Sequence, residues 1–506
     1  MPDETRSRPL SPAIEELHEW WAEIRRLESI EALLSWDQET GMPASAAIGR
    51  SQQLSTVATL LHDRLTSDQL QRAIEKALQA EGTPLESAVA LEARRRSGRA
   101  LAIPRRLAGE LAAAGAVGAA SWQQARAENS FDRFQPALER MIRLKREQAA
   151  AIGAASGDLY DALLDEYEPE TRAADLDRLF SHLESELSPR ARALPVAPAA
   201  AVAGGAPAYP LERQREVGLR VVAALGFDPA RGRIDASAHP FCITIGPDDV
   251  RFTWRADVHD LRPGLYGFLH EAGHALYEQG LPPDLFESPA GGAASLGLHE
   301  SQSRLWENLV GRSPGFCRWL WAWLPEHLPV PFSTAEQLWA HVHEMARGAI
   351  RVDADQVTYD LHILARYRLE RSLLSGDLEV GELIDAWHAV YADLLGVTPA
   401  DANHGVLQDI HWAIGLFGYF PTYTLGNLAA SQLFEAACAE LGDLDAGFAG
   451  GEFAPLLGWL GERVHRLAAT VSPAEVIVRA TGRPLQADAF LRHVHELFEQ
   501  MSEAVG

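Results

Sequence analysis

Cysteine is scarce in this sequence, and long apolar runs are missing. Only three cysteines occur among the 506 residues, and no two of them form a C-x-x-C pair. We therefore expect neither a disulfide framework nor a zinc site built from thiolates. The first ten residues lack the apolar segment of a signal peptide, and no uncharged stretch of about 18 strongly apolar residues follows. These absences predict a cytoplasmic protein with no membrane partner.

Positive charge is also in short supply. The chain has 45 Lys and Arg residues against 70 Asp and Glu residues, which gives a formal net charge of −25. Nucleic acid and anionic lipid repel so acidic a surface, so we expect neither as a partner. Hydrophobic residues make up 47% of the chain. This fraction is ordinary for a globular protein with a sizeable core.

Helical patterns cover most of the chain. From residue 11 onward, apolar residues recur every three or four positions, which predicts a long amphipathic helix with one buried stripe. The stripe comprises Ile14, Leu17, Trp21, Ile24, Leu27, Ile30 and Leu34. Strand patterns are confined to residues 241–245 and 250–254, on either side of a Gly-Pro-Asp-Asp turn. We therefore predict a mainly α protein with a small β-sheet.

A low-charge stretch rich in Ala, Pro and Gly occupies residues 194–209. Such a composition is typical of an exposed loop or linker. It divides the chain into an N-terminal helical lobe, residues 1–193, and a second lobe, residues 210–506. Helices of similar character are predicted on both sides, so we interpret the two lobes as parts of one large integrated domain.

The pentapeptide His270-Glu-Ala-Gly-His274 follows the predicted sheet and lies within a helical pattern. On a helix, residues i and i+4 share a face, so His270 and His274 can converge on one metal ion, with Glu271 beside it. A catalytic zinc normally needs a third protein ligand, and Glu300, in a second predicted helix, is the candidate. On spacing alone, a salt bridge from Glu300 to Arg304 at i+4 fits the sequence better than metal ligation.

Six stretches of the chain resemble, in order, the motifs of a known family. They are His239-Pro-Phe241, Asp249-Val-Arg-Phe-Thr253, His270-Glu-Ala-Gly-His274, His299-Glu-Ser-Gln302, Ile350-Arg-Val-Asp-Ala-Asp355 and Gly405-Val-Leu-Gln-Asp-Ile-His-Trp412. The family is that of the carboxypeptidase Taq metallocarboxypeptidases, and the similarity extends over nearly the whole chain. The resemblance implies a large, helical, cleft-bearing, zincin-like peptidase in which a small sheet lies next to the metal-binding helix.

The resemblance also implies a metal site and a general base. His270, His274 and Glu300 would bind one divalent metal ion per chain. Zinc is the default ion, and cobalt is an activating substitute because two imidazoles and a carboxylate accept several divalent ions. Glu271 would accept a proton from the attacking water and deliver it to the departing amine.

The resemblance assigns substrate recognition to Arg351, at the position of the family's carboxylate-binding arginine. A planar guanidinium suits this role because it can hold a carboxylate through two parallel hydrogen bonds. A salt bridge from Arg351 to Asp355 at i+4 is the structural alternative. One departure lies nearby, because Gln356 stands where the family usually has Glu.

Four further polar residues lie in or beside the motif stretches. Tyr423 and His411 are candidate donors to the oxygen that gains negative charge during hydrolysis, or to the bound carboxylate. His239 is a candidate substrate-binding group, and Asp249 could orient a metal-binding histidine. A purely structural role fits His239 and Asp249 equally well.

The sequence therefore predicts a metal-dependent carboxypeptidase with broad side-chain preference. Its substrates would be unstructured peptides with a free C-terminal carboxylate, and the family precedent suggests a homodimer. Two alternatives remain open at this point. One is a metal-dependent oligoendopeptidase with the same site, and the other is a non-catalytic peptide-binding scaffold.

Overall fold

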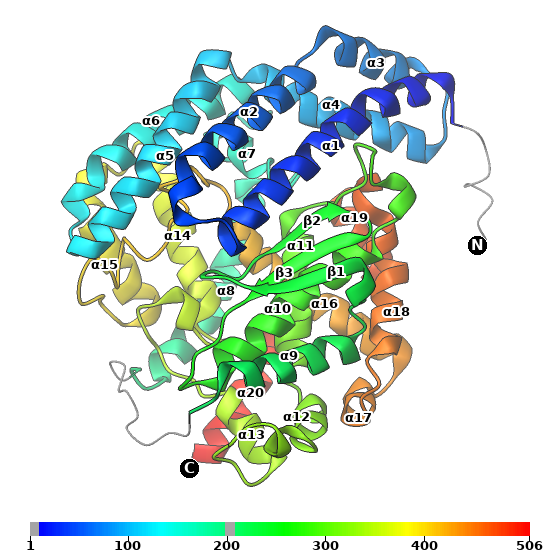
Figure 1. Cartoon of the computed structure of the whole chain (residues 1–506). Helices are drawn as coiled ribbons and strands as arrows, with labels where there is room; N and C mark the ends of the chain where they lie inside the picture. The colour runs from blue at the N-terminus through cyan, green and yellow to red at the C-terminus, as the bar shows by residue number, and fades with distance from the viewer. Residues whose placement is uncertain (1–9, 198–207, 506) are drawn as a thin grey trace. The chain divides into compact units, whose positions relative to one another are not determined.

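The computed structural model describes residues 10–197 and 208–505. Helices account for most of these residues, and three strands form a small sheet (Figure 1). The predicted mainly α fold with a small sheet is thus confirmed. Within the described residues, no helix combines the length and the apolar character that a membrane span needs.

Contacts group the chain into two compact units. The first takes its residues from 1–102, 208–294 and 451–482, and the second takes its residues from 103–207, 295–450 and 483–506. Each unit thus contains residues from both sides of the predicted loop at 194–209. Residues 198–207 of that loop lie outside the described residues. The lobe boundary at this loop stays a prediction.

The first unit contains the sheet and eight α-helices of the described chain. The helices are α1 (Pro12–Thr40), α2 (Ala47–Leu65), α3 (Asp68–Gln79), α4 (Pro84–Ala102), α9 (Leu211–Leu225), α10 (Leu261–Gly280), α18 (Ala454–Arg463) and α19 (Pro473–Thr481). The strands are β1 (Gly232–Ala236), β2 (Cys242–Gly246) and β3 (Asp249–Trp254), in the order β1-β3-β2.

The predicted hairpin is present and corresponds to β2 and β3. These strands pair antiparallel, with Cys242 opposite Phe252 and Gly246 opposite Asp249. Strand β1 was not predicted, and it pairs with β3 in the parallel direction. Its sequence, Gly-Arg-Ile-Asp-Ala, is only five residues long and has a single β-branched residue, Ile234, so its strand propensity is weak. The partner strand, rather than local propensity, therefore determines its conformation.

The long N-terminal helix is confirmed as α1, but its buried stripe is narrower than predicted. Ile14, Leu17, Trp21 and Ile24 are buried, whereas Ile30 is 48% exposed. Each step of three residues turns the position back by about 60°, because a helix advances about 100° per residue. Three such steps separate Trp21 from Ile30, so Ile30 lies on the opposite face.

Helix α10 packs against β3, β2 and α9. Its N-terminus is capped by the Asp260 side chain, which accepts a hydrogen bond from the Arg262 N–H at 2.9 Å. Phe268 stacks on Trp254 of β3, with ring centroids 5.0 Å apart. Gly218 of α9 makes room for the same ring, because a Cβ there would collide with it. These contacts fix which face of α10 is buried against the sheet.

The second unit is helical, and its long helices surround a large apolar core. Its helices are α5 (Arg105–Glu128), α6 (Gln135–Ile152), α7 (Leu159–Leu164), α8 (Ala173–Ala193), α11 (Leu296–Arg304), α12 (Pro314–Trp321), α13 (Ala335–Val342), α14 (Tyr359–Ser375), α15 (Leu383–Leu395), α16 (Pro421–Leu441), α17 (Leu444–Ala449) and α20 (Asp488–Val505). Helix α11 packs along α16, and α14 packs on α16, α15 and α8.

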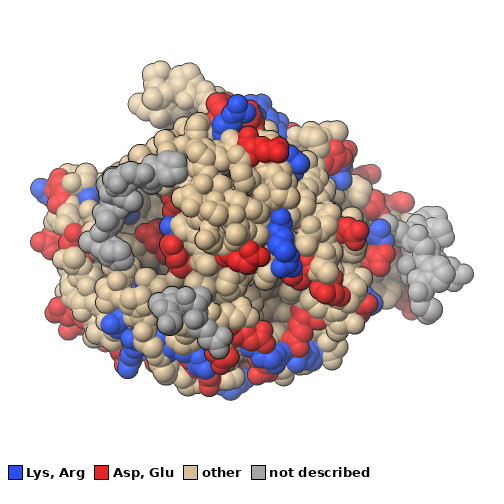
Figure 2. Space-filling view, turned by 90° about the horizontal axis from the view of Figure 1, so that it is seen from below, with Lys and Arg blue, Asp and Glu red and all other residues tan. Residues whose placement is uncertain are grey.

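Acidic and basic side chains are interspersed on the face shown in Figure 2. Many charged side chains form exposed ion pairs, such as Arg492 with Glu435 at 2.6 Å. Exposed pairs of this kind contribute about 0–1 kcal/mol each. These ion pairs therefore contribute little to the stability of the fold.

Two glycines of α5 offer a test of the packing in the second unit. A Cβ at Gly118 would collide with the Ala413 carbonyl oxygen, whereas a Cβ at Gly109 would meet no atom within 4 Å. We expect Gly118→Ala to lower the free energy of unfolding by about 1–3 kcal/mol, because backbone must move. Gly109→Ala should raise it by about 0.5–1 kcal/mol, because alanine favours the helix.

Urea unfolding followed by circular dichroism measures both changes. A similar stabilisation by the two substitutions would contradict the close approach of α5 to the Ala413 backbone.

Candidate functional site

The two histidines of the pentapeptide lie on α10, one turn apart. The ring centroids of His270 and His274 are 5.0 Å apart, and the ring planes meet at 85°. Both side chains are half-buried, whereas Glu271 is only 6% exposed. The structure therefore has the shared helix face that the i, i+4 spacing predicts.

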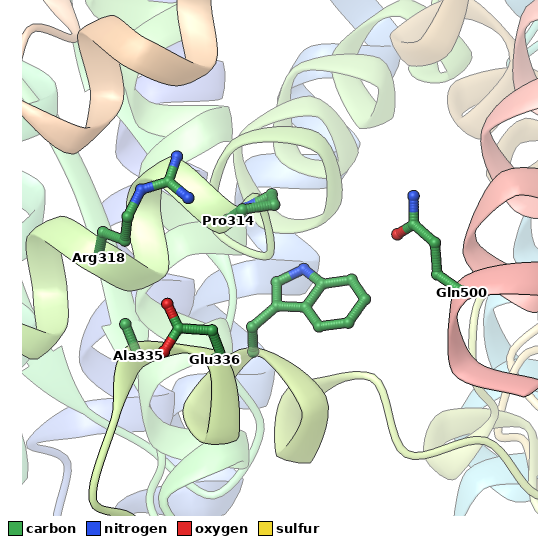
Figure 3. Close-up of a pocket in the computed structure, with 6 residues that line it drawn as sticks. Pro314, Arg318, Ala335, Glu336 and Gln500 are labelled. Carbon is green, nitrogen blue, oxygen red and sulfur yellow. The ribbon is translucent and has the colours of Figure 1, made fainter. Parts of the chain in front are cut away.

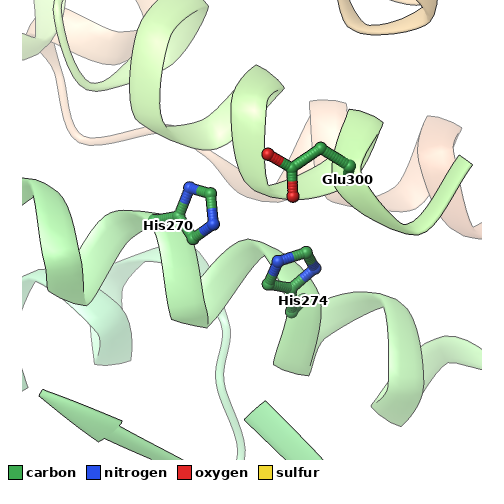
Figure 4. A group of neighbouring side chains, drawn as sticks. All are labelled: His270, His274 and Glu300. Carbon is green, nitrogen blue, oxygen red and sulfur yellow. The ribbon is translucent and has the colours of Figure 1, made fainter. Parts of the chain in front are cut away.

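Glu300 of α11 faces these two imidazoles (Figure 4). One ligand atom from each of His270, His274 and Glu300 lies within 4.8 Å of the other two. Two imidazole nitrogens and a carboxylate oxygen are a donor set that catalytic zinc uses, with a further position open to water. The three residues therefore fit a divalent metal ion.

The predicted salt bridge between Glu300 and Arg304 is also present. Arg304 Nε lies 2.7 Å from Glu300 Oε1. Burial opposes the charge of Arg304, but Tyr359, Glu300 and Glu307 outweigh it and raise the pKa of the guanidinium above its ordinary value. A carboxylate has two oxygens, so the salt bridge and metal ligation are compatible rather than alternatives.

Arg351 lies in a short 3₁₀ turn, Arg351–Asp353, and its guanidinium is bound by Asp409. Nε and Nη2 donate to Asp409 Oδ1 at 3.0 and 2.7 Å, and Nη1 donates to the Tyr359 hydroxyl at 3.1 Å. The alternative partner Asp355 instead accepts backbone N–H groups, including that of Val357 at 2.9 Å. The i+4 argument fails because Ala354, at ψ 140°, is extended and ends the turn.

Asp409 is shared between two arginines. Its other oxygen accepts a hydrogen bond from Arg366 Nε at 2.6 Å, and the Arg366 side chain is fully buried. Burial alone would raise the pKa of Asp409, but the guanidinium groups of Arg351 and Arg366 hold that pKa well below its usual range. Two positive charges and one negative charge therefore share this part of the second unit.

His411 and Tyr423 lie together beside Arg351. His411 Nε2 and the Tyr423 hydroxyl are 3.2 Å apart, and the Arg351 guanidinium lies over the Tyr423 ring, 5.2 Å from its centroid. Burial lowers the pKa of His411 to about 4, although Asp409 opposes the shift. Burial raises the pKa of Tyr423 well above its ordinary value. Both side chains are therefore neutral at pH 7.

The structure places His239 and Asp249 in the first unit. His239 is exposed, and its carbonyl oxygen accepts a hydrogen bond from the Ser237 hydroxyl at 2.6 Å. Asp249 binds Arg251 through both carboxylate oxygens, at 2.6 and 2.7 Å. The predicted roles of His239 in substrate binding and of Asp249 in orienting a histidine stay predictions.

An arginine cluster surrounds Arg351, His411 and Tyr423, and four of its members were not predicted from the sequence. They are Arg366, Asp409, Tyr359 and Tyr419. Asp409 stands inside the motif Gly405 to Trp412, but its partner Arg351 is 58 residues away in sequence. Tyr419 contacts the rings of both His411 and Tyr423, at centroid distances of 5.4 and 5.5 Å. The sequence signal for Tyr419 is that it lies in a short aromatic-rich stretch, which also contains the candidate Tyr423.

Gln356 contacts the C-terminal helix α20. Its side-chain oxygen lies 2.9 Å from His493 Nε2. Burial lowers the pKa of His493 to about 4, so this imidazole is neutral at pH 7. An uncharged amide therefore suits its neutral partner, and the contact ties α20 to the segment that follows Arg351.

A separate pocket of about 320 Å³ opens in the second unit (Figure 3). It is lined by Pro314, Arg318, Ala335, Glu336, Trp339 and Gln500. These residues come from α12, α13 and α20, and none of them belongs to the predicted site.

A helical fold that carries a His-His-Glu group with a buried glutamate between the histidines places the chain in the class of metallopeptidases. The family described as carboxypeptidase Taq (M32) metallopeptidase matches residues 16–498. The chain belongs to this family.

Curated relatives and solved structures agree with this assignment. The chain is 43% identical to "Thermostable carboxypeptidase 1" of Thermus thermophilus over 508 aligned positions, which cover 96% of this chain and 98% of that one. The M32 carboxypeptidase structure from Deinococcus radiodurans R1 is similar with a TM-score of 0.91 at 37% identity, and the match covers 97% of this chain and 99% of that one. A carboxypeptidase structure from Pyrococcus furiosus gives a TM-score of 0.92 at 33% identity, covering 96% and 99%.

The chain is accordingly a metal-dependent carboxypeptidase, a peptide hydrolase that releases C-terminal amino acids. The comparisons support this prediction and do not support the endopeptidase or scaffold alternatives.

Asp409 gives a prediction about the stability of the second unit. Asp409→Asn would leave Arg351 and Arg366 buried side by side without their counter-charge. We expect the free energy of unfolding to fall by about 3–5 kcal/mol, as it does when one partner of a buried ion pair is removed. Denaturant unfolding with intrinsic tryptophan fluorescence measures the change.

The matched control is Asp401→Asn in the same loop, where the carboxylate pairs with the exposed His404. It should cost less than about 1 kcal/mol. Equal effects of the two substitutions would show that the arginine cluster does not depend on Asp409.

Proposed function

We propose that His270, His274 and Glu300 hold one divalent metal ion, zinc by default and cobalt as an activating substitute. Their convergence within 4.8 Å is the observation that carries the proposal. An ion held there would supply Lewis acidity, which makes a water molecule acidic enough to lose a proton near neutral pH. The metallopeptidase family supports a metal in this role.

Glu271 acts as the general base in this proposal. It follows His270 directly on α10, and it is 6% exposed. A carboxylate in such restricted surroundings can take the proton of the attacking water and then give it to the departing amine. The proton is thereby moved from the nucleophile to the leaving group without entering bulk solvent.

Arg351 recognises the C-terminal carboxylate of the peptide in this proposal. Three of its N–H groups bind Asp409 and Tyr359. Among the described residues, no partner accepts the remaining N–H on each terminal nitrogen, and a carboxylate needs two parallel donors of this kind. Asp409, which is itself bound by Arg366, fixes the orientation of the Arg351 guanidinium.

The charge balance of this cluster supports anion binding. Arg351 and Arg366 contribute two positive charges and Asp409 contributes one negative charge, so one positive charge remains. His411 and Tyr423 do not change this balance, because burial keeps both neutral at pH 7. A bound carboxylate would neutralise the remaining charge in surroundings where screening by water is weak.

His411 and Tyr423 donate hydrogen bonds in the proposed reaction. His411 Nε2 and the Tyr423 hydroxyl are 3.2 Å apart, so one of them donates a hydrogen bond to the other. The tautomer of His411 decides which of the two is the donor in this bond. We propose that they serve the oxygen that gains negative charge during hydrolysis or the bound carboxylate.

The remaining expectations stay predictions. The family resemblance supports broad side-chain preference and a homodimer. A cytoplasmic location is compatible with the three free cysteines Cys242, Cys317 and Cys438.

Glu271→Gln tests the general base. The variant should bind zinc as the unmodified protein does, because position 271 is not a proposed ligand. Its kcat should fall by roughly 10²–10⁴-fold, the range that general-base catalysis contributes. Elemental analysis of dialysed protein gives the metal content, and mass spectrometry of peptide digests gives the rate.

Glu278→Gln is the control on the same helix, since that carboxylate accepts the Thr244 hydroxyl at 2.8 Å. It should keep both zinc and turnover. Full activity of the position 271 variant would refute the proposed base.

Arg351→Ala tests recognition of the chain end. The unmodified enzyme should trim peptides with a free C-terminus stepwise and should leave the same peptides intact when they are amidated. In the variant, kcat/KM for the free acid should fall by roughly 10²–10³-fold, or about 3–4 kcal/mol, because a charged partner is lost. The loss for amidated peptides should be much smaller.

Arg351→Lys keeps the charge without the planar fork and should give an intermediate value. Arg368→Ala removes a partly exposed arginine that pairs with Glu184 on the same unit, and it serves as the control. Comparable cleavage of free and amidated peptides by the unmodified enzyme would contradict the exopeptidase mechanism.

A further inference from the structure

The first turn of α11, the helix that carries Glu300, is bound by residues far away in sequence. The N–H groups of its first turn are taken by residues 167 and 168, far away in sequence, and by the capping serine. The Leu296 N–H donates to the Tyr167 carbonyl oxygen at 3.0 Å, and the Gly297 N–H donates to the Glu168 carboxylate. The Leu298 N–H donates to the Ser295 hydroxyl at 3.1 Å.

Burial of the Glu168 side chain disfavours its charged form. Its side chain is 3% exposed, and burial raises its pKa to about 8, although the hydrogen bonds from Gly297 and Ser295 oppose the shift. Its position is also tightly packed, because a Cβ at Gly297 would lie 2.7 Å from a Glu168 oxygen.

The anchored turn leads directly to the proposed metal ligand. Helix α11 has nine residues, and Glu300 comes three residues after Gly297. On its far side, Glu300 packs on α16, where a Cβ at Gly426 would lie 2.6 Å from Glu300 Cγ. Arg304 binds the carboxylate from one turn further along the helix. A shift of the first turn of α11 would therefore disturb the close packing of Glu300 on α16.

Tyr167 also reaches the arginine cluster, through Tyr419. The Tyr167 ring packs edge-on against Tyr419, with centroids 5.2 Å apart. Tyr419 in turn contacts His411 and Tyr423. The dipeptide Tyr167-Glu168 thus supports both the start of α11 and the tyrosine beside the proposed proton donors.

We propose that Glu168 is a positioning residue for the metal site, which acts through the backbone of α11 to hold Glu300 in place for ligation. The inference rests on the proposed role of Glu300 as a metal ligand. Groups that orient a metal ligand from outside typically change metal affinity by about 10–100-fold when they are removed.

Zinc affinity of the full-length protein tests the proposal without relying on activity. Protein is stripped with a chelator and titrated with Zn²⁺ in competition with a chromogenic chelator. Glu168→Ala should weaken zinc binding by about 10–100-fold. Glu168→Gln should recover most of the affinity, because an amide oxygen can still accept the Gly297 N–H.

A second buried carboxylate provides the matched control. Glu86 accepts the backbone N–H groups of Ser11 and Thr83 at 2.7 Å each, at the start of α4. Glu86→Ala should lower the melting temperature but leave zinc affinity unchanged. Affinity that falls equally in both variants would mean that zinc binding reports general stability, and the positioning role would be rejected.

Glu300→Ala separates this inference from the proposed function. If that variant loses zinc while Glu168→Ala keeps unmodified affinity, the positioning role is wrong and the metal site stands. If Glu300→Ala keeps unmodified affinity, the proposed ligand set is wrong. Should Glu168→Ala fail to fold, Glu168→Asp replaces it, because a side chain shorter by one methylene cannot reach Gly297. Unmodified zinc affinity in Glu168→Asp would then overturn the proposal.

Discussion

Asp409 accepts hydrogen bonds from two buried arginines, and much of the second unit depends on this arrangement. Arg366 is fully buried and Arg351 is nearly so, which requires a counter-charge within the same interior. Asp409 supplies one negative charge for two positive ones. In the proposed function, the remaining charge and the two N–H groups of Arg351 that no described residue accepts would give this interior a preference for one further carboxylate. The neutrality of His411 and Tyr423 preserves that preference at pH 7.

Glu300 shows how one carboxylate can serve two purposes. One oxygen binds Arg304, and the carboxylate still groups with His270 and His274. The salt bridge at i+4 and metal ligation look like competing interpretations in the sequence. In the structure they are compatible, because a carboxylate has two oxygens and the salt bridge uses only one of them.

Local patterns predicted the parts of the fold and the site that neighbouring residues determine. The histidine pair of α10 and the hairpin of β2 and β3 follow from spacing and turn chemistry alone. Partners far apart in sequence could not be found in that way: Arg351 and Asp409 are 58 residues apart, and Glu168 and Gly297 are 129 apart. Strand β1 belongs to the same group, because its conformation comes from a parallel partner. The alternative salt bridge from Arg351 to Asp355 is absent because it requires a helix that the extended Ala354 interrupts.

Two carboxylates that bind backbone N–H groups illustrate what decides the protonation of such a group. Hydrogen bonds from Thr83 and Ser11 lower the pKa of Glu86 to about 2. Glu168 receives the same kind of bond, yet burial outweighs it and raises the pKa to about 8. Glu86 is therefore held at little electrostatic cost, whereas the charged form of Glu168 is disfavoured where it lies. A fold that needed only a helix cap at this point would be served by the Ser295 hydroxyl, which already binds Leu298. The additional carboxylate fixes the position of a turn that leads, three residues later, to Glu300.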